Sequence, residues 1–242
     1  MSLTFLSLNI EADRHLDLVR AYLEKNEPDV VCLQEIFRIH AEQFAKKLGY
    51  HMVFAPHVIF SQAGGEFPPL GEWGIAIMTK LRVQKTDTTY YGAEGDMIPD
   101  RLNAATPHPR ALLTAEIEHD GKMFLFATTH FTWAMPRAAD QMQHADMLAL
   151  QAVLDKLPDF VLAGDFNAPR NTELFRRFSE LYRSHVPLDV ETTIDQLLHR
   201  AAPLELVVDH LFSKGDYIVT DVNVVCGLSD HCAITANIDK LS

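Results

Sequence analysis

The chain has 242 residues, of which 48% are apolar, so it can bury a sizeable core, and one domain over residues 1–242 is the simplest expectation. Its 21 Lys and Arg against 33 Asp and Glu give a net charge of −12, which disfavours a protein that binds nucleic acid non-specifically along many phosphates. No apolar run approaches the roughly 18 residues of a membrane-spanning helix. The first residues form an expected strand that leads to Asn9, without the basic region of a secretory signal, so a cytoplasmic location is expected.

The cysteine content supports the same expectation. Cys32, Cys226 and Cys232 are odd in number and include no CxxC pair. Such usage is more typical of reduced thiols in a cytoplasmic protein than of a disulfide framework.

Alternating or β-branched apolar stretches predict many short strands. Strands are expected over residues 4–10, 30–34, 50–55, 74–79, 81–86, 111–117, 123–129, 160–163, 207–212, 217–225 and 233–238. Apolar residues at helical spacing predict one helix after Asp13, a second around Ala41 and a third from about Ala138 to Leu157. Strands and helices therefore mix throughout the chain, which favours an α/β fold of mixed sheets covered by helices.

Two long stretches, residues 56–72 and 87–109, show no periodicity of either kind. Loops of this length in a compact domain commonly form the rim or lid of a functional site. We expect them to set the choice of substrate.

The motif Gly164-Asp165-Phe166-Asn167 is the most informative feature of the sequence. It follows directly on the apolar strand 160–163 and places a carboxylate and a carboxamide at the end of that strand. Because alternate residues of extended backbone share a face, the Asp165 and Asn167 side chains point the same way. The Asp165 carboxylate can only accept hydrogen bonds, whereas the Asn167 carboxamide can both donate and accept them. Such a pair suits an attacking water and a phosphate oxygen.

Other predicted strands also end in polar residues that a core would exclude. These residues are Asn9, Gln34, Glu35, His130, Asp209, His210, Asp230 and His231. If the strand ends meet at one edge, they form an oxygen-rich cluster of the kind that Mg²⁺ prefers, with Mn²⁺ as the alternative ion. No closely spaced set of His and Cys residues indicates Zn²⁺.

Together these motifs resemble the endonuclease/exonuclease/phosphatase superfamily, the metal-dependent phosphoesterases related to deoxyribonuclease I and exonuclease III. The matching motifs occur in the family's order and span nearly the whole chain. They are Leu8-Asn9, Gln34-Glu35, Gly74-Ile75-Ala76-Ile77, His130, Gly164-Asp165-Phe166-Asn167, Val208-Asp209-His210-Leu211-Phe212 and Ser229-Asp230-His231. The resemblance implies a four-layer α/β/β/α sandwich, in which two mixed sheets are flanked by helices.

The resemblance also implies roles for the matching residues. Glu35 would be the principal metal ligand, helped by Asn9 and Asp230 directly or through water. Asp165 would orient or deprotonate the attacking water. Asn167 would hold a phosphoryl oxygen.

The remaining roles concern the phosphate. His231 would act on it as a cationic stabiliser or acid/base group, and Asp209 would fix the His231 ring. His130 would contact the phosphate from the other side, with Glu72 as a carboxylate partner. Arg110 stands where relatives often place a basic residue, which fits either a phosphate contact or a surface salt bridge.

Four further residues have weaker signals. Glu11 occupies a position near the metal that is Asp in some relatives, so its role is less defined. His51, His144 and His199 are expected to be surface or packing residues and not ligands.

The expected activity is therefore hydrolysis of a phosphate ester, as a phosphodiesterase or phosphatase, by in-line attack of an activated water. The substrate would be a small molecule, a nucleotide or a lipid headgroup. Two alternatives remain open: a DNA or RNA endonuclease or exonuclease, and a catalytically inactive protein of the same fold that binds phosphoesters. The sequence indicates no protein partner.

Overall fold

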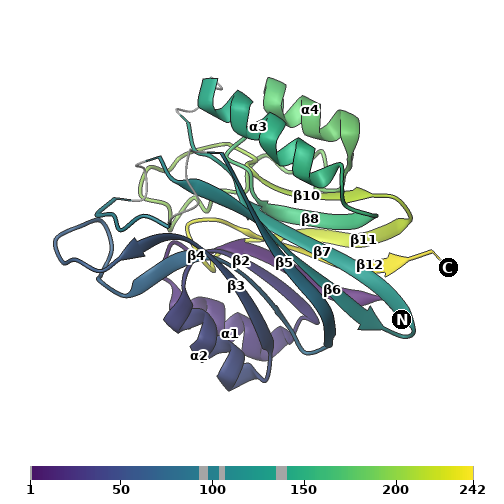
Figure 1. The fold of residues 1–242 in the computed structure, drawn as a ribbon, viewed down its shortest axis with the longest axis horizontal. Coiled ribbons are helices and arrows are strands. Elements are labelled where there is room, and N and C mark those ends of the chain that lie inside the picture. Colours follow the sequence, from purple (N-terminus) through teal and green to yellow (C-terminus); the bar gives the residue numbers. More distant parts are fainter. Residues whose placement is uncertain (1, 93–97, 104–106, 135–140, 242) are drawn as a thin grey trace.

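A computed structural model describes residues 2–92, 98–103, 107–134 and 141–241 of the chain. Two six-stranded sheets pack face to face, and helices cover the outer face of each sheet (Figure 1). The expected four-layer α/β/β/α sandwich of mixed sheets is confirmed.

The first sheet contains the N-terminal strands and the last two strands of the chain. Its strand order is β11-β12-β1-β2-β4-β3, and β1 and β2 run parallel whereas the other neighbours are antiparallel. The strands are β1 (Leu3–Asn9), β2 (Val30–Phe37), β3 (His51–Phe60), β4 (Gly71–Thr79), β11 (Tyr217–Val225) and β12 (Ala233–Lys240).

The second sheet is formed by the middle of the chain. Its order is β5-β6-β7-β8-β10-β9, and again one central pair, β7 and β8, is parallel. The strands are β5 (Arg82–Gly92), β6 (Pro109–His119), β7 (Lys122–His130), β8 (Phe160–Asp165), β9 (Arg183–Ser184) and β10 (Asp209–Lys214).

Helices α1 (Leu16–Asn26) and α2 (Arg38–Leu48) cover the first sheet, and α3 (Gln141–Leu154) and α4 (Glu173–Leu181) cover the second (Figure 1). Strand β1 shows how the layers are coupled. Phe5 points into the core between the sheets and stacks on Phe126 with ring centroids 5.7 Å apart. Leu6 and Leu8 point to the opposite face and pack in the same cluster as Val19 of α1. Because both faces of β1 are covered, every residue of the strand except Thr4 is buried.

The sheet register brings the polar strand ends together at one edge of the sandwich. Asn9, the last residue of β1, is paired with Gln34 near the C-terminal end of β2, and His130 is paired with Asp165 at the ends of β7 and β8. Asp209 begins β10 directly opposite Asp165. The parallel central pair of each sheet therefore contributes its C-terminal end to the same edge.

Gly164 makes the approach of β8 to β7 feasible. Its φ is +151°, and a Cβ atom at this position would lie 2.0 Å from the carbonyl oxygen of Thr129. Only glycine lets the two strands lie this close, so the first residue of the Gly-Asp-Phe-Asn motif has a structural function.

Several element boundaries differ from expectation. β3 extends to Phe60 and β5 extends to Gly92, so both long stretches without periodicity begin as strand. Helix α4 was not predicted. The described part of α3 begins at Gln141, and the predicted start near Ala138 lies outside the described residues.

The prediction that all three cysteines are reduced is wrong. Cys226 and Cys232 form a disulfide, whereas Cys32 is a buried free thiol. The two cysteines flank a short loop whose ends meet in space, a proximity that their spacing in the sequence did not reveal. The cysteine content therefore gives no support for a cytoplasmic location.

Within the described part of the chain, no helix has the length and apolar character to cross a membrane.

Candidate active site

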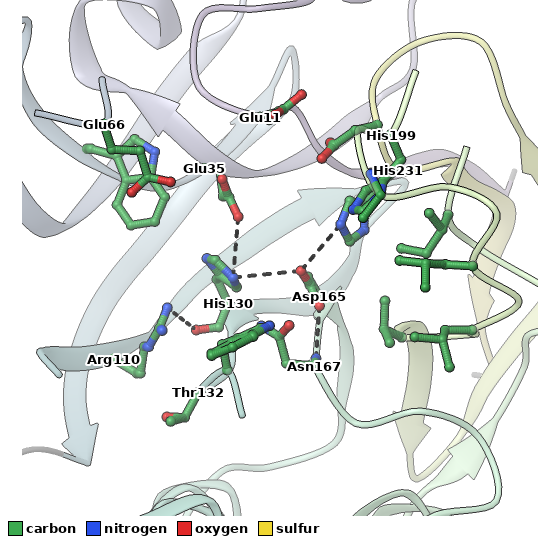
Figure 2. Close-up of a pocket in the computed structure, with 18 of the residues that line it drawn as sticks. Glu11, Glu35, Glu66, Arg110, His130, Thr132, Asp165, Asn167, His199 and His231 are labelled. Carbon is green, nitrogen blue, oxygen red and sulfur yellow. Dashed lines mark hydrogen bonds and ion pairs between the residues drawn. The ribbon is translucent and has the colours of Figure 1, made fainter. Parts of the chain in front are cut away.

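A cavity of about 440 Å³ lies at the edge where the polar strand ends meet. Figure 2 shows His130 and Asp165 at its centre, with Arg110 and Thr132 on one side and His231 on the other. A cavity of this size falls in the range of small-molecule sites in proteins.

Asn9 joins two carboxylates on the cavity floor. Its Nδ2 atom donates to Glu35 Oε1 at 3.0 Å and to Asp165 Oδ2 at 3.1 Å. Its Oδ1 atom accepts the backbone N–H of Glu11 at 3.1 Å. The Asn9 carboxamide therefore turns its N–H donors, and not its oxygen, toward Glu35 and Asp165. Asn9 was expected to help Glu35 as a metal ligand, a role that needs the oxygen.

Glu35 lies close to two other carboxylates of the site, those of Asp230 and Asp165. Burial, followed by the neighbouring carboxylate of Asp230, raises the pKa of Glu35 to about 8, and Asp165 adds to this effect. Glu35, His130 and Asp165 each offer one ligand atom, and the three atoms lie within 4.8 Å of one another. Such crowding of acidic groups is what a bound divalent cation would relieve.

Asp230 also faces this cluster. Its side chain is buried and its Oδ1 atom accepts a hydrogen bond from the Ser229 hydroxyl at 3.1 Å. Burial is the main cause that raises the pKa of Asp230. The backbone carbonyl of Asp230 accepts the N–H of Asp195 at 2.8 Å, which fixes the loop between Cys226 and Cys232.

Asp165 is held by the turn that follows it. Its Oδ1 atom accepts the backbone N–H of Asn167 at 2.8 Å, and Asn167 adopts a left-handed φ of 47°, which Asn tolerates better than most residues. The Asn167 side chain donates to the carbonyl of Phe131 at 3.0 Å. Burial raises the pKa of Asp165 to about 6, with a further contribution from Asp209.

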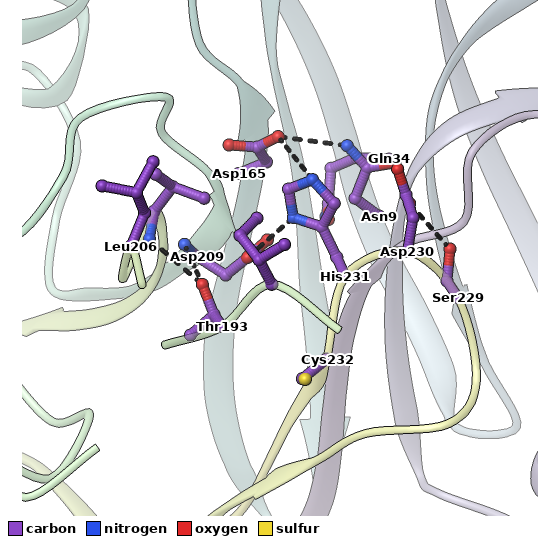
Figure 3. Close-up of polar contacts among 12 residues, drawn as sticks. Asn9, Gln34, Asp165, Thr193, Leu206, Asp209, Ser229, Asp230, His231 and Cys232 are labelled. Carbon is purple, nitrogen blue, oxygen red and sulfur yellow. Dashed lines mark hydrogen bonds and ion pairs between the residues drawn. The ribbon is translucent and has the colours of Figure 1, made fainter. Parts of the chain in front are cut away.

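His231 and Asp209 form a close pair beside Asp165 (Figure 3). His231 Nδ1 lies 2.8 Å from Asp209 Oδ2, and His231 Nε2 lies 3.9 Å from Asp165 Oδ2. Burial alone would lower the pKa of His231, but the carboxylates of Asp209 and Asp165 outweigh it and hold the pKa well above its ordinary value. The ring is therefore a cation at neutral pH.

His130 has the opposite character. Its Nε2 atom lies 3.7 Å from both Glu35 Oε1 and Asp165 Oδ2, so it faces the same carboxylates. Burial and the nearby Arg110 guanidinium lower the pKa of His130 well below its ordinary value. One neutral and one charged imidazole thus flank Asp165.

The structure does not place Glu72 beside His130. The Glu72 carboxylate pairs with the guanidinium of Arg38, and Glu72 is not part of the cavity wall. Glu72 lies in β4, but its side chain projects to the side of the sheet where α2 begins. The expected carboxylate partner of His130 is therefore not Glu72.

Arg110 lies in the cavity wall and not on the surface. It is only 6% exposed, and its Nη1 atom donates to the His130 carbonyl at 3.4 Å. No ion pair within 4 Å forms between Arg110 and any carboxylate of the described residues, so the guanidinium is not part of a surface salt bridge. The phosphate contact of Arg110 stays a prediction.

Sequence reasoning missed several residues of the cavity wall. His199 was expected at the surface or in packing, but it lines the cavity with its ring centroid 6.5 Å from that of His231. Thr193 does not line the cavity, but its Oγ1 atom accepts the backbone N–H of Asp209 at 3.1 Å and so fixes the start of β10. Thr132 and Trp133 follow His130 and also line the cavity, a position that the polar strand end at His130 could have indicated.

Glu11 lies in the wall as well. It pairs with the side chains of Arg14, His15 and Arg200, so its charge is distributed among three basic groups at the rim. Of the other histidines, His51 is exposed and does not line the cavity.

Comparison with known proteins agrees with this architecture. Solved structures that match over nearly the whole chain include an endonuclease/exonuclease/phosphatase from Bacteroides vulgatus (16% identity, 100% of both chains, TM-score 0.74). A mannosyl-6-phosphatase from Bacteroides thetaiotaomicron matches with 15% identity over 98% of this chain and 100% of that one, at a TM-score of 0.71. The catalytic domain of human Nocturnin with bound sulfate matches with 18% identity over 99% and 94%, at a TM-score of 0.74.

Because these sequence identities are low, the structural matches by themselves establish only the fold. A search of curated protein sequences gives no significant match. The sequence profile of the Endonuclease/Exonuclease/phosphatase family, however, matches residues 6–231 and so includes every residue of the cluster from Asn9 to His231. The chain therefore belongs to the endonuclease/exonuclease/phosphatase family.

Proposed function

We propose that the protein is a metal-dependent phosphoesterase that hydrolyses a small phosphate ester with an activated water. The observation that carries the proposal is the position of Asp165. Its carboxylate lies between a neutral histidine, His130, and a charged one, His231. It also accepts a hydrogen bond from the Asn9 amide, which donates to Glu35 as well. Phosphoester hydrolysis needs a base, a cation near the phosphoryl oxygens and neutral donors, and this arrangement supplies them.

Asp165 is the proposed general base. Its pKa of about 6 leaves it ionised at neutral pH yet basic enough to take a proton from an attacking water. The backbone N–H of Asn167 occupies Oδ1, so Oδ2 is the atom that faces His130, His231 and the Asn9 amide. We assign the proton transfer to Oδ2.

The two histidines and two polar side chains would contact the phosphate. His231, held by Asp209, would place a positive charge against a phosphoryl oxygen, where it stabilises negative charge that develops in the transition state. Neutral His130, together with Asn167 and the buried guanidinium of Arg110, would donate hydrogen bonds to the other oxygens.

The donor set fits a hard divalent cation. Burial is the main cause that raises the pKa of both Glu35 and Asp230, and a neighbouring carboxylate adds to it in each case: Asp230 for Glu35 and Glu11 for Asp230. Their ligand atoms are oxygens, which suit Mg²⁺ or Mn²⁺. Glu35 and Asp230 would hold the ion, and Asn9 would orient the Glu35 carboxylate by its Nδ2 donor. When bound, the ion would supply Lewis-acid stabilisation of the phosphoryl group.

Two observations support a small substrate. The cavity of about 440 Å³ suits a ligand of limited size, and the net charge of −12 disfavours a long polyanion. Among the matching structures, one is named a mannosyl-6-phosphatase and another holds a sulfate anion, both of which are compatible with a small phosphate ester.

The test is hydrolysis of bis(p-nitrophenyl) phosphate and p-nitrophenyl phosphate with and without Mg²⁺. Turnover that is lost with EDTA and in Asp165→Asn supports the proposal, and the ratio of the two rates separates a diesterase from a monoesterase. Glu180→Gln, which neutralises an exposed carboxylate on α4, is the matched control and should retain full activity. Full activity of Asp165→Asn would refute the role of Asp165.

A further inference from the structure

Trp133 is an aromatic side chain in an unusual position on the cavity wall. It is 49% exposed, whereas the second tryptophan of the chain, Trp73, also lines the cavity but is 1% exposed. Among the described residues, Trp133 is the only large apolar side chain that is more than one-third exposed and also lines the cavity. An indole that is half exposed at the lip of a cavity leaves an apolar face for a ligand to cover.

The two residues that precede Trp133 are held by contacts with α3 and with Tyr91. The carbonyl of Thr132 accepts a hydrogen bond from Gln143 of α3 at 2.7 Å, and the Thr132 hydroxyl donates to Asp146 of the same helix. Phe131, two residues before Trp133, is fully buried and stacks on Tyr91 with ring centroids 6.2 Å apart. The backbone that leads into the indole is therefore held in place before any ligand binds, which lowers the entropy cost of a stacking contact.

Trp133 is also linked to the proposed phosphate site through Phe131. The Asn167 side chain donates to the Phe131 carbonyl at 3.0 Å, and the N–H of Phe131 donates to the Asp165 carbonyl at 2.8 Å. The proposed base and the proposed phosphate donor are thus bonded to the residue two positions before Trp133. A phosphate held at Asn167 leaves the rest of the ester within the same cavity as the indole.

The rest of the wall indicates what kind of group the indole would cover. Phe67 and Met142 line the cavity with Trp133 and add apolar surface, while the carboxylates of Glu11 and Glu66 lie at its edge. An apolar face next to hydrogen-bond acceptors suits a ring with one flat face and polar substituents at its rim.

We propose that Trp133 is the specificity-determining residue of the site and that it stacks on a ring in the alcohol portion of the phosphate ester, a pyranose or a nucleoside. This inference rests on the proposed phosphoesterase function and narrows its substrate class. The stacking contact favours ring-bearing esters over ring-free ones because only the former bury the exposed indole face.

The first test compares kcat/KM for mannose 6-phosphate and AMP, which carry the two kinds of ring, with kcat/KM for glycerol 3-phosphate, which carries none. In Trp133→Ala, the preference for the better ring-bearing ester should fall by about 5- to 150-fold, the range expected for loss of one stacking contact, mainly through KM. Trp133→Phe should retain most of the preference. The control is Leu197→Ala, which truncates a 94% exposed apolar side chain outside the cavity wall and should leave the preference unchanged.

The second test measures binding without turnover, in the Asp165→Asn variant. Acrylamide should quench the exposed Trp133 and not the buried Trp73, and mannose 6-phosphate or AMP should protect the exposed fraction where glycerol 3-phosphate does not. Protection supports the inference even if none of these esters is turned over by the wild-type protein, an outcome that would count against the proposed function alone.

Three results would overturn the inference. One is a preference for ring-bearing esters that stays within twofold of wild type in Trp133→Ala. Another is the absence of protection by either ring-bearing ligand. The third is a Trp133→Ala defect that appears only with phospholipid vesicles, because the indole would then contact a membrane surface and not a substrate ring.

Discussion

His231 Nδ1 lies 2.8 Å from the Oδ2 atom of Asp209, and this contact joins the loop before β12 to the first residue of β10. Asp209 is itself fixed, because its backbone N–H donates to Thr193 Oγ1 and its register places it opposite Asp165. The Asp209 carboxylate therefore stabilises the positive charge of the His231 ring and fixes its orientation, with Nε2 turned toward Asp165.

The first prediction concerns Asp209→Asn. The carboxylate raises the pKa of His231, so its replacement by a neutral amide should lower that pKa, and His231 should lose its proton at a lower pH. We expect kcat/KM at neutral pH to fall by about 10- to 100-fold and the high-pH limb of the pH–rate profile to move to lower pH. An unchanged high-pH limb, measured with a correctly folded variant, would show that His231 does not act as a cation.

The second prediction concerns the low-pH limb. Asp165 must be ionised to accept a proton, and its pKa is about 6, so activity should rise as the pH increases through about 6. Asp165→Asn should reduce kcat by about 10²- to 10⁴-fold and remove this limb from whatever activity remains. A profile of kcat/KM against pH for wild type, Asp165→Asn and the Glu180→Gln control decides the matter. A limb that persists in Asp165→Asn would assign the titration to another group.

The comparison of expectation with structure shows which features the sequence encodes locally. The strands β1 and β8 were predicted because each is an apolar run that ends at a polar residue, Asn9 and Asp165. Mixed sheets covered by helices followed from strands and helices that mix along the chain, and the four layers followed from the resemblance to the family. Even the meeting of the strand ends could be inferred, since parallel central strands place their C-terminal ends at one edge.

What the sequence did not reveal depends on the direction of side chains and on contacts between distant segments. Glu72 in β4 has the right residue type, but its carboxylate pairs with Arg38 because the side chain faces the other side of the sheet. Cys226 and Cys232 meet only because the loop between them closes. Helix α4 had a local signal, with Thr172 as N-cap and Leu174 and Phe178 on one face, but nine residues gave too short a period to recognise.

The third prediction concerns the metal and uses stability in place of activity. Glu35 has a pKa of about 8 in the folded protein against about 4.3 when unfolded, so between these values the folded state binds more protons. The metal-free protein should therefore become less stable as the pH rises from about 4.3 to about 8. A cation that binds ionised Glu35 should offset this loss, so Mg²⁺ should raise Tm more at about pH 8 than at about pH 5.

Glu35→Gln is the matched variant for this experiment. It removes the buried charge, so it should raise the Tm of the metal-free protein at about pH 8, by about 2–4 °C for each kcal/mol recovered. It should also abolish the increase in Tm with Mg²⁺. If Mg²⁺ stabilises Glu35→Gln as much as wild type, the ion binds elsewhere.

The fourth prediction concerns the disulfide between Cys226 and Cys232. The bond closes the loop of residues 227–231, which carries Asp230 and His231, so it restrains two residues of the proposed site. Closure of so short a loop stabilises the fold by about 2 kcal/mol in the chain-entropy description. Treatment with a dithiol reductant, or the substitution Cys226→Ser, should lower the free energy of unfolding by about that amount.

The same reduction should lower kcat only in part, because other bonds also hold this loop. The N–H of Cys232 donates to the Thr193 carbonyl at 2.7 Å, and Gly227 donates to the Asp195 carboxylate. Cys32→Ala is the control, since this buried thiol is not in the disulfide and the variant should keep its sensitivity to reductant. Thiol titration of the unfolded, non-reduced protein should find one free cysteine, and three would show that the bond does not form.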